Sequence, residues 1–238
     1  MSMTARIGLL IPSSNSSVEP EFYRALPPDV TLHTARLFLS HINEASLQRM
    51  IMDIDAQSQL LATADVDVIM LGAVTPGWIK GASFDKELSA RIAAASGKRA
   101  STTATALNDS LRHLGVTRIA VGGPYDKAVS DLATRFLGAN GFEVVGTGEL
   151  GLQANLEVGR LSAEPAYDMG VQLARDYPQA QAIVFAGTNW GVMPATQKLE
   201  DKIGKPVVSS TAAAMWQALR MVGWRGKLAG QGKLLSDV

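Results

Sequence analysis

The chain has 238 residues, of which 47% are hydrophobic and 18% are charged. This composition fits a soluble globular protein with one large or two small domains and excludes a largely disordered chain. Lysine plus arginine and aspartate plus glutamate both number 22, so no basic surplus favours nucleic acid or an anionic membrane as partner.

Cysteine is absent from the sequence. This excludes disulfides, thiolate metal sites and thiol catalysis, and it fits a cytoplasmic location. No signal-peptide pattern opens the chain, and its apolar runs fall short of the ~18 residues that a membrane helix needs. We therefore expect a cytoplasmic protein with neither a membrane nor a nucleic acid as partner.

Strand-like and helix-like segments alternate along the first half. Continuous apolar runs predict buried strands, and apolar residues at helical spacing predict helices. The predicted elements of this half are, in order, a strand at 6–12, a helix at 44–64, a strand at 66–71, and helices at 83–95 and 104–114.

The same alternation restarts in the second half. Its predicted elements are strands at 118–122, 142–145, 182–185 and 207–209, and helices at 127–137, 166–176, 194–203 and 212–222. Alternating strands and helices indicate an α/β fold in which helices cover both faces of parallel sheets.

The restart is an internal repeat. Arg6-Ile7-Gly8 matches Arg118-Ile119-Ala120 at an offset of 112, and Thr75 matches Thr188 at an offset of 113. Two predicted helices end in Leu-Arg-x-x-Gly, at 111–115 and 219–223, an offset of 108. Chance similarity between two βα units is the alternative, and the agreement of three offsets argues against it.

We therefore expect two pseudo-symmetric α/β lobes with a ligand cleft between them. The N-terminal lobe would span residues 1–115 and the C-terminal lobe residues 116–223. The tail at 224–238 would pack back on the N-terminal lobe.

Two strand ends occupy equivalent places in the repeat. One runs Leu71-Gly72-Ala73-Val74-Thr75-Pro76-Gly77, and the other runs Phe185-Ala186-Gly187-Thr188-Asn189-Trp190. Ligands of α/β proteins bind beyond the carboxyl ends of the strands, so both segments are candidate site loops.

Several further motifs carry a family resemblance. They are Ile7-Gly8-Leu9-Leu10-Ile11-Pro12-Ser13-Ser14-Asn15, Lys80-Gly81-Ala82-Ser83-Phe84, Pro124-Tyr125, Asn155-Leu156-Glu157-Val158-Gly159-Arg160 and Gly204-Lys205-Pro206-Val207-Val208-Ser209-Ser210. Together with the two strand ends, they resemble the aspartate/glutamate racemase superfamily, in the branch that holds maleate cis-trans isomerase and arylmalonate decarboxylase.

The resemblance implies that a substrate binds between two pseudo-symmetric lobes. In such enzymes each lobe can contribute one cysteine at the end of its central strand; the isomerases and racemases use both, and the decarboxylase only the second. This chain has Val74 and Gly187 at those stations. Neither side chain can donate or accept a proton.

Small polar residues follow the first strand. Ser13, Ser14 and Asn15 could donate hydrogen bonds to a carboxylate, or could form a turn and a helix cap. The resemblance favours Asn15 as a carboxylate ligand. Val74 and Thr75 could hold an oxyanion through backbone N–H groups and the Thr75 hydroxyl, or could be an ordinary β-to-α connection.

The second half supplies the other candidates. Tyr125 could donate to an oxyanion or act as an acid, although a lone tyrosine is more often a surface residue; the resemblance favours the site. Asn155 is a second candidate carboxylate contact or a turn residue. Thr188 and Asn189 could hydrogen-bond a ligand or cap the next element, and Gly187 leaves room for a water beside the substrate.

Metal and cofactor sites are not indicated. His33, His41 and His113 have no metal-ligand spacing, and only His41 is kept as a weak site candidate. The glycines of 72–77 lack the Gly-Lys-Ser/Thr ending of a phosphate loop.

The resemblance implies a cofactor-independent enzyme for a small carboxylate or dicarboxylate. In our first hypothesis it is a lyase or isomerase that stabilises an oxyanion without thiols, with Tyr125, Thr75 and Thr188 as catalytic residues. The substrate-binding residues would be Ser13, Ser14, Asn15, Val74, Asn155, Gly187 and Asn189. The alternatives are a hydrolase of an amide, imide or lactone that uses a held water, and a carboxylate-binding protein without catalysis. Assembly into a homo-oligomer is left open.

Overall fold

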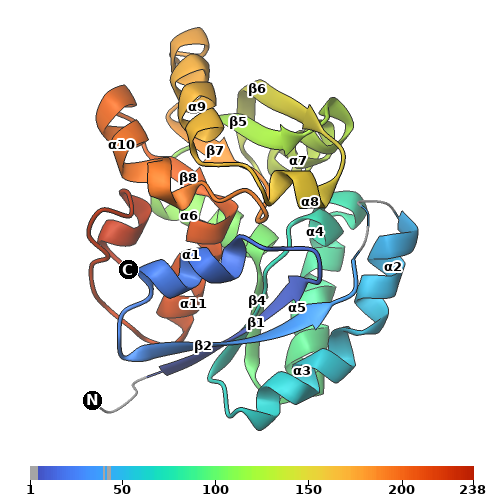
Figure 1. The fold of residues 1–238 in the computed structure, drawn as a ribbon. Coiled ribbons are helices and arrows are strands. Elements are labelled where there is room, and N and C mark those ends of the chain that lie inside the picture. The colour runs from blue at the N-terminus through green and yellow to red at the C-terminus, as the bar shows by residue number, and fades with distance from the viewer. Residues whose placement is uncertain (1–4, 40, 42–43) are drawn as a thin grey trace.

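Two parallel four-stranded sheets form the two halves of the molecule (Figure 1). The computed structural model describes residues 5–39, 41 and 44–238. The first sheet has the strand order β2 (Val30–Leu37), β1 (Ala5–Pro12), β3 (Val68–Leu71) and β4 (Arg99–Thr102). The second has the equivalent order β6 (Glu143–Leu152), β5 (Arg118–Tyr125), β7 (Ala182–Phe185) and β8 (Val207–Ser209). The identical order confirms the two pseudo-symmetric lobes expected from the repeat.

The central strands read as apolar runs because helices cover both faces of each sheet. Every residue of β3 and of β7 is buried. Strands buried on both faces have no polar side, and this is why these segments show no alternation in the sequence.

Helices of the first half follow the strands in the usual α/β manner. They are α1 (Val18–Ala25), α2 (Glu44–Met52), α3 (Ile54–Thr63), α4 (Thr75–Lys80), α5 (Ala82–Ser96) and α6 (Thr103–His113). The second half has α7 (Lys127–Ala139), α8 (Asn155–Val158), α9 (Glu164–Asp176), α10 (Met193–Ile203), α11 (Ser210–Met221) and the short 3₁₀ helix η1 (Leu234–Ser236).

The repeated helices α6 and α11 pack against each other and join the halves. Leu107 and Leu111 of α6 share one buried core with Met215 and Leu219 of α11. The N-caps are equivalent too, since Thr102 accepts from the Thr105 N–H and Ser209 accepts from the Ala212 N–H. Two symmetry-related helices thus form much of the contact between the halves.

The structure differs from the predicted elements in several places. The helix predicted over 44–64 is broken at Asp53 into α2 and α3, and the strand predicted at 142–145 extends to Leu152. The elements α1, β2, α4, β4 and α8 were not predicted. The elements α4, β4 and α8 have only four to six residues, too few for a periodic pattern to show. In contrast, α1 and β2 have eight residues each, and both were overlooked.

The C-terminal tail is attached to α10 and α11. The Gly232 and Lys233 N–H groups donate to Gln197 and Glu200 of α10, and η1 packs on α11. The predicted attachment to the N-terminal lobe, and the boundary at residue 115, stay predictions. Within the described part of the chain, no helix combines the length and apolar character that crossing a bilayer requires.

Helices α9 and α10 pack closely at Gly170, and Gly138 provides a matched control in open space. A methyl group at Gly170 of α9 would overlap the buried Leu199 of α10, whereas one at Gly138 of α7 would meet nothing. We expect Gly170→Ala to lower the free energy of unfolding by about 1–3 kcal/mol, because the core must repack. The matched control Gly138→Ala should raise it by about 0.5–1 kcal/mol. Urea unfolding of both variants measures this, and an unchanged stability for Gly170→Ala would contradict the close packing.

Candidate functional site

A small polar pocket lies at the carboxyl ends of β1, β3, β5 and β7. Its lining comes from both halves of the chain: Pro12, Asn15, Leu39, Ala73, Val74, Thr75, Tyr125, Asn155, Gly187, Thr188 and Asn189. Eight of the ten candidate residues therefore line one pocket. Of the remaining two, Ser14 hydrogen-bonds a residue of the lining and Ser13 does not line it.

Asn15 has both a capping role and a place in the pocket. Its Oδ1 accepts from the Ser17 and Val18 N–H groups at 3.0 and 3.1 Å, which caps α1. Its Nδ2 donates to the Thr188 hydroxyl at 3.1 Å. The amide carries a second Nδ2 proton, and that proton is what Asn15 could offer to a carboxylate.

The Thr188 hydroxyl also hydrogen-bonds a residue of the first half. Its hydroxyl donates to the Gly72 carbonyl at 3.1 Å and accepts from Asn15. The hydroxyl proton is therefore engaged in a contact between the halves. The predicted catalytic role of Thr188 would require that proton to leave Gly72.

A second chain of hydrogen bonds also crosses the pocket. Tyr125 donates to Asn155 Oδ1 at 2.6 Å, and Asn155 Nδ2 donates to the Ser14 hydroxyl at 2.8 Å. Burial raises the pKa of the Tyr125 phenol above its ordinary value. The phenol is therefore protonated at neutral pH, so it can act as a donor or an acid but is unsuited to act as a base.

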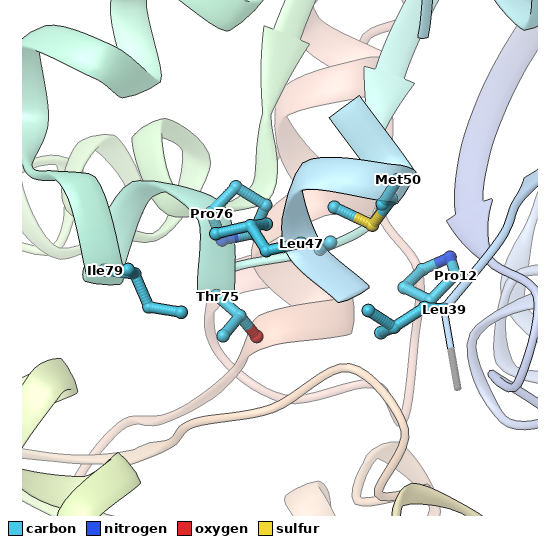
Figure 2. A pocket seen from close by; sticks show the side chains of 8 residues that line it. Pro12, Leu39, Leu47, Met50, Thr75, Pro76 and Ile79 are labelled. Carbon is cyan, nitrogen blue, oxygen red and sulfur yellow. The ribbon is translucent and has the colours of Figure 1, made fainter. Parts of the chain in front are cut away.

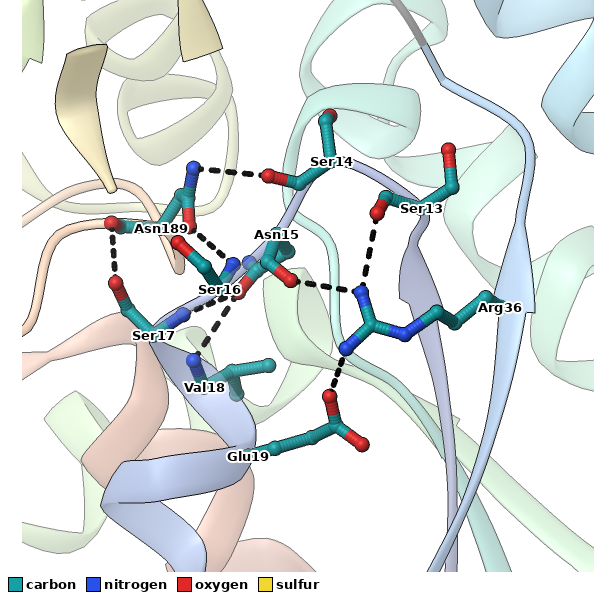
Figure 3. Close-up of polar contacts among 9 residues, drawn as sticks. All are labelled: Ser13, Ser14, Asn15, Ser16, Ser17, Val18, Glu19, Arg36 and Asn189. Carbon is teal, nitrogen blue, oxygen red and sulfur yellow. Dashed lines mark hydrogen bonds and ion pairs between the residues drawn. The ribbon is translucent and has the colours of Figure 1, made fainter. Parts of the chain in front are cut away.

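Asn189 is fully engaged by the protein. Its Nδ2 donates to the Asn155 carbonyl at 2.6 Å and the Ser14 carbonyl at 3.4 Å, and its Oδ1 accepts from the Ser16 N–H at 2.8 Å. Its own carbonyl accepts from the Ser17 hydroxyl at 2.8 Å. Figure 3 shows Asn189 against the Ser14–Ser17 segment. These contacts indicate that Asn189 positions the loops around the pocket.

Ser13 has a structural role at the same loop. Its Oγ accepts from the Leu39 N–H at 3.0 Å. Arg36 of β2 donates to the Ser13 and Asn15 carbonyls at 3.0 and 2.9 Å and pairs with Glu19 of α1 (Figure 3). Sequence reasoning missed Arg36, because nothing in the chain near it signals that it would reach this loop.

Thr75 is the first residue of α4, so the loop after β3 is shorter than predicted. Within the described chain its hydroxyl makes no hydrogen bond, although it borders the pocket. The N–H groups of a first helical turn have no partner inside the helix, and Pro76 has none to offer. Val74 and Thr75 remain the candidates for binding an oxyanion.

A small apolar pocket adjoins the polar one. It is lined by Pro12, Leu39, Leu47, Met50, Ala73, Thr75, Pro76 and Ile79 (Figure 2). Pro12, Leu39, Ala73 and Thr75 line both pockets. Leu47, Met50 and Ile79 were not among the predicted site residues, because apolar side chains on helices are ordinarily core residues.

Gly187 borders the pocket with a backbone that suits glycine alone. Its φ of +125° lies in a region that side chains rarely adopt, and its N–H donates to the Ser210 hydroxyl at 3.0 Å. A Cβ at this position would lie 3.4 Å from the Tyr125 ring. Space beside Tyr125 thus exists at Gly187, but only glycine can leave it without backbone strain.

The histidines are not part of the pocket lining. His33 hydrogen-bonds Thr31 within β2 at 3.1 Å, and the His113 ring packs on Trp216 at 5.1 Å. Across residues 5–39, 41 and 44–238, no group of three or more His, Asp or Glu side chains could hold a metal ion.

The arylmalonate decarboxylase family model matches residues 7–235. The chain belongs to this family. It is 27% identical to a maleate isomerase of Geobacillus stearothermophilus over 97% of each chain, and 26% identical to an arylmalonate decarboxylase of Bordetella bronchiseptica over 98% of each. The fold matches the maleate isomerase Iso from Pseudomonas putida S16 with a TM-score of 0.91 and 27% identity over 98% of each chain.

A crystal structure of arylmalonate decarboxylase matches with a TM-score of 0.85 and 25% identity, over 97% of this chain and 98% of that one. These matches confirm the predicted branch and its fold. The chain is therefore an enzyme of the lyase or isomerase type.

We expect Asn189→Ala to lower the free energy of unfolding by about 1–3 kcal/mol, because buried carbonyl and N–H groups would lose their partners. A matched control is Asn140→Ala, which removes one side-chain contact at the end of α7 and should cost less than about 1 kcal/mol. Thermal and urea unfolding compare the two. Equal small losses would show that Asn189 does not hold the loops together.

Proposed function

We propose that this enzyme is a cofactor-independent lyase that removes a carboxyl group from a small dicarboxylate bearing an apolar substituent. The supporting observation is the apolar pocket that shares four lining residues with the polar pocket. A ligand that reaches into both would carry an anionic group and an apolar group on one carbon atom. Substituted malonates have this arrangement.

The polar pocket would hold the carboxylate that stays. The second Nδ2 proton of Asn15 and the hydroxyl proton of Ser14 could both donate to it. Contacts to an ionised acceptor are stronger than neutral ones, so two or three of them fix the orientation of the substrate.

The apolar substituent would lie against apolar side chains such as Leu39, Met50 and Ile79, and the leaving carboxylate beside it would be shielded from water. A carboxylate is costly to hold away from water, and departing as neutral CO₂ relieves that cost. The carbon–carbon bond breaks, its electron pair stays with the substrate, and an enediolate forms. The Thr75 hydroxyl and the Val74 and Thr75 N–H groups would stabilise its oxygens.

A proton must then reach the substrate carbon. Tyr125 is the candidate acid, because its phenol is protonated at neutral pH and borders the pocket. Water would return a proton to the phenolate after each turnover. This chain cannot add a thiol to a double bond, because Val74 and Gly187 stand at the positions where the family enzymes have cysteine.

The first test is a substrate panel. We expect CO₂ release from phenylmalonate, slower release from malonate, which lacks the apolar substituent, and no conversion of maleate to fumarate. Product analysis by NMR in deuterated water measures all three and shows where the proton enters. Maleate isomerisation would contradict the proposal, hydrolysis of an added lactone or imide would favour the hydrolase, and binding without turnover would favour a binding protein.

A second test concerns the proton. Tyr125→Phe should lower kcat for phenylmalonate by about 10²-fold or more, the usual contribution of a positioned acid, and raise KM much less. The matched control is Tyr23→Phe, a change on the exposed face of α1 that should leave kcat unaltered. Near-wild-type turnover in Tyr125→Phe would show that Tyr125 is not the acid, and Thr75 or a held water would then be the candidate proton donor.

A further inference from the structure

Glu21 of α1 is a buried carboxyl outside the pocket lining. We infer that it is a positioning residue, which holds the first-half and second-half loops of the site together and releases them when it ionises. It touches neither the pocket nor the reacting atoms, so its effect passes through the helices that follow those loops.

The carboxyl reaches across the boundary between the halves. Its Oε1 accepts from the N–H of Met193, the first residue of α10, at 2.7 Å. Thr211, the second residue of α11, is its hydroxyl neighbour. Oε2 of Glu21 and Oγ1 of Thr211 are both buried, and neither has a well-formed hydrogen bond to another described group. One carboxyl of the first half is thus seated at the N-termini of two helices of the second.

Helices α1 and α10 both continue directly from a loop of the site. Asn15 caps α1, so a shift of α1 carries Asn15 with it. The segment that leads into α10 contains Thr188 and Asn189. The Asn15–Thr188 and Ser17–Asn189 contacts join the two loops at 3.1 and 2.8 Å. Displacing α1 from α10 would therefore pull apart the polar wall of the pocket.

The environment of Glu21 makes this contact depend on pH. Burial raises the pKa of its carboxyl from 4.5 to about 7, against the opposing effect of its hydrogen bonds. The charged side chain that acts on it is Arg24, one turn further along α1; α10 and α11 present the Met193 N–H and the Thr211 hydroxyl. A groove of about 690 Å³ between the halves is lined in part by Glu21 and Arg24, which gives protons a route.

The direction of the effect follows from the raised pKa. Between pH 4.5 and about 7 the closed state holds a proton that an opened, hydrated carboxyl would release. Opening is therefore favoured as pH rises through this window, by up to tenfold for each unit of pKa difference. The contact is strongest below pH 4.5 and weakest above about pH 7.

Hydrogen exchange tests this without a substrate. Protection of peptides covering 14–22 and 186–196, corrected for intrinsic exchange, should fall by about tenfold or more in wild type between pH 6 and pH 8. Peptides within 127–139 should change much less. In Glu21→Gln, which cannot ionise, the loss should disappear. The control Glu200→Gln alters another carboxyl with a raised pKa, on α10 but bonded to Val207 and Lys233, and should keep the wild-type pH response.

Three results would overturn the inference: equal protection at both pH values in wild type, a loss spread evenly over all peptides, or an unchanged pH response in Glu21→Gln. The comparison of wild type at the two pH values tests the inference even if Glu21→Gln does not fold. Lack of turnover would refute the proposed function alone, because exchange is independent of it.

Discussion

The site of this enzyme depends on hydrogen bonds between its two halves. Asn15 and Ser14 follow β1 of the first half, whereas Thr188 and Asn155 belong to the second, and their side chains bond directly at 3.1 and 2.8 Å. Neither half contains a complete set of donors. Because each donor also caps a helix or fixes a loop, the geometry of the pocket and the docking of the halves are one property. This is why we expect changes at Asn189 and Glu21, which do not have to touch a ligand, to alter the pocket.

The pseudo-symmetry of the fold is broken where chemistry requires it. Thr75 and Thr188 occupy equivalent positions, but Thr75 begins α4 and has a free hydroxyl in the described structure, whereas the Thr188 hydroxyl donates to Gly72. The first half also adds an apolar pocket formed by α2 and α4 residues, and the second half adds Tyr125 and Asn155. In the proposed mechanism, one lobe would supply the oxyanion site beside an apolar wall, and the other would supply the proton donor.

Sequence predicted the parts of this arrangement that depend on local pattern. Apolar runs located β1, β3, β5 and β7, and the repeat located the two strand ends that carry Thr75 and Thr188. Arg36, Leu47 and Met50 could not be found in this way, because a surface arginine and two helical apolar residues have ordinary local patterns. Their roles come from where α2 and β2 pack. Contacts bear on the alternatives for Asn15 and Ser13: both residues have structural bonds, and of the two only Asn15 borders the pocket. Carboxylate binding by either residue stays a prediction.

The two missing thiols have different structural consequences, and this bears on the chemistry that remains. Val74 is a buried residue whose backbone leads into α4, so a side chain there is accommodated. Gly187 has a φ of +125°, and its N–H is bonded to Ser210, so this backbone is built around the absence of a side chain. Restoring a thiol at 187 would strain the loop that carries Thr188 and Asn189, by about 1–3 kcal/mol. A Cβ at Gly187 would already contact the Tyr125 ring, so this part of the pocket is narrow. In the proposed mechanism Tyr125 takes the place of a thiol, and its proton, which is donated to Asn155 at 2.6 Å, must turn toward the substrate carbon.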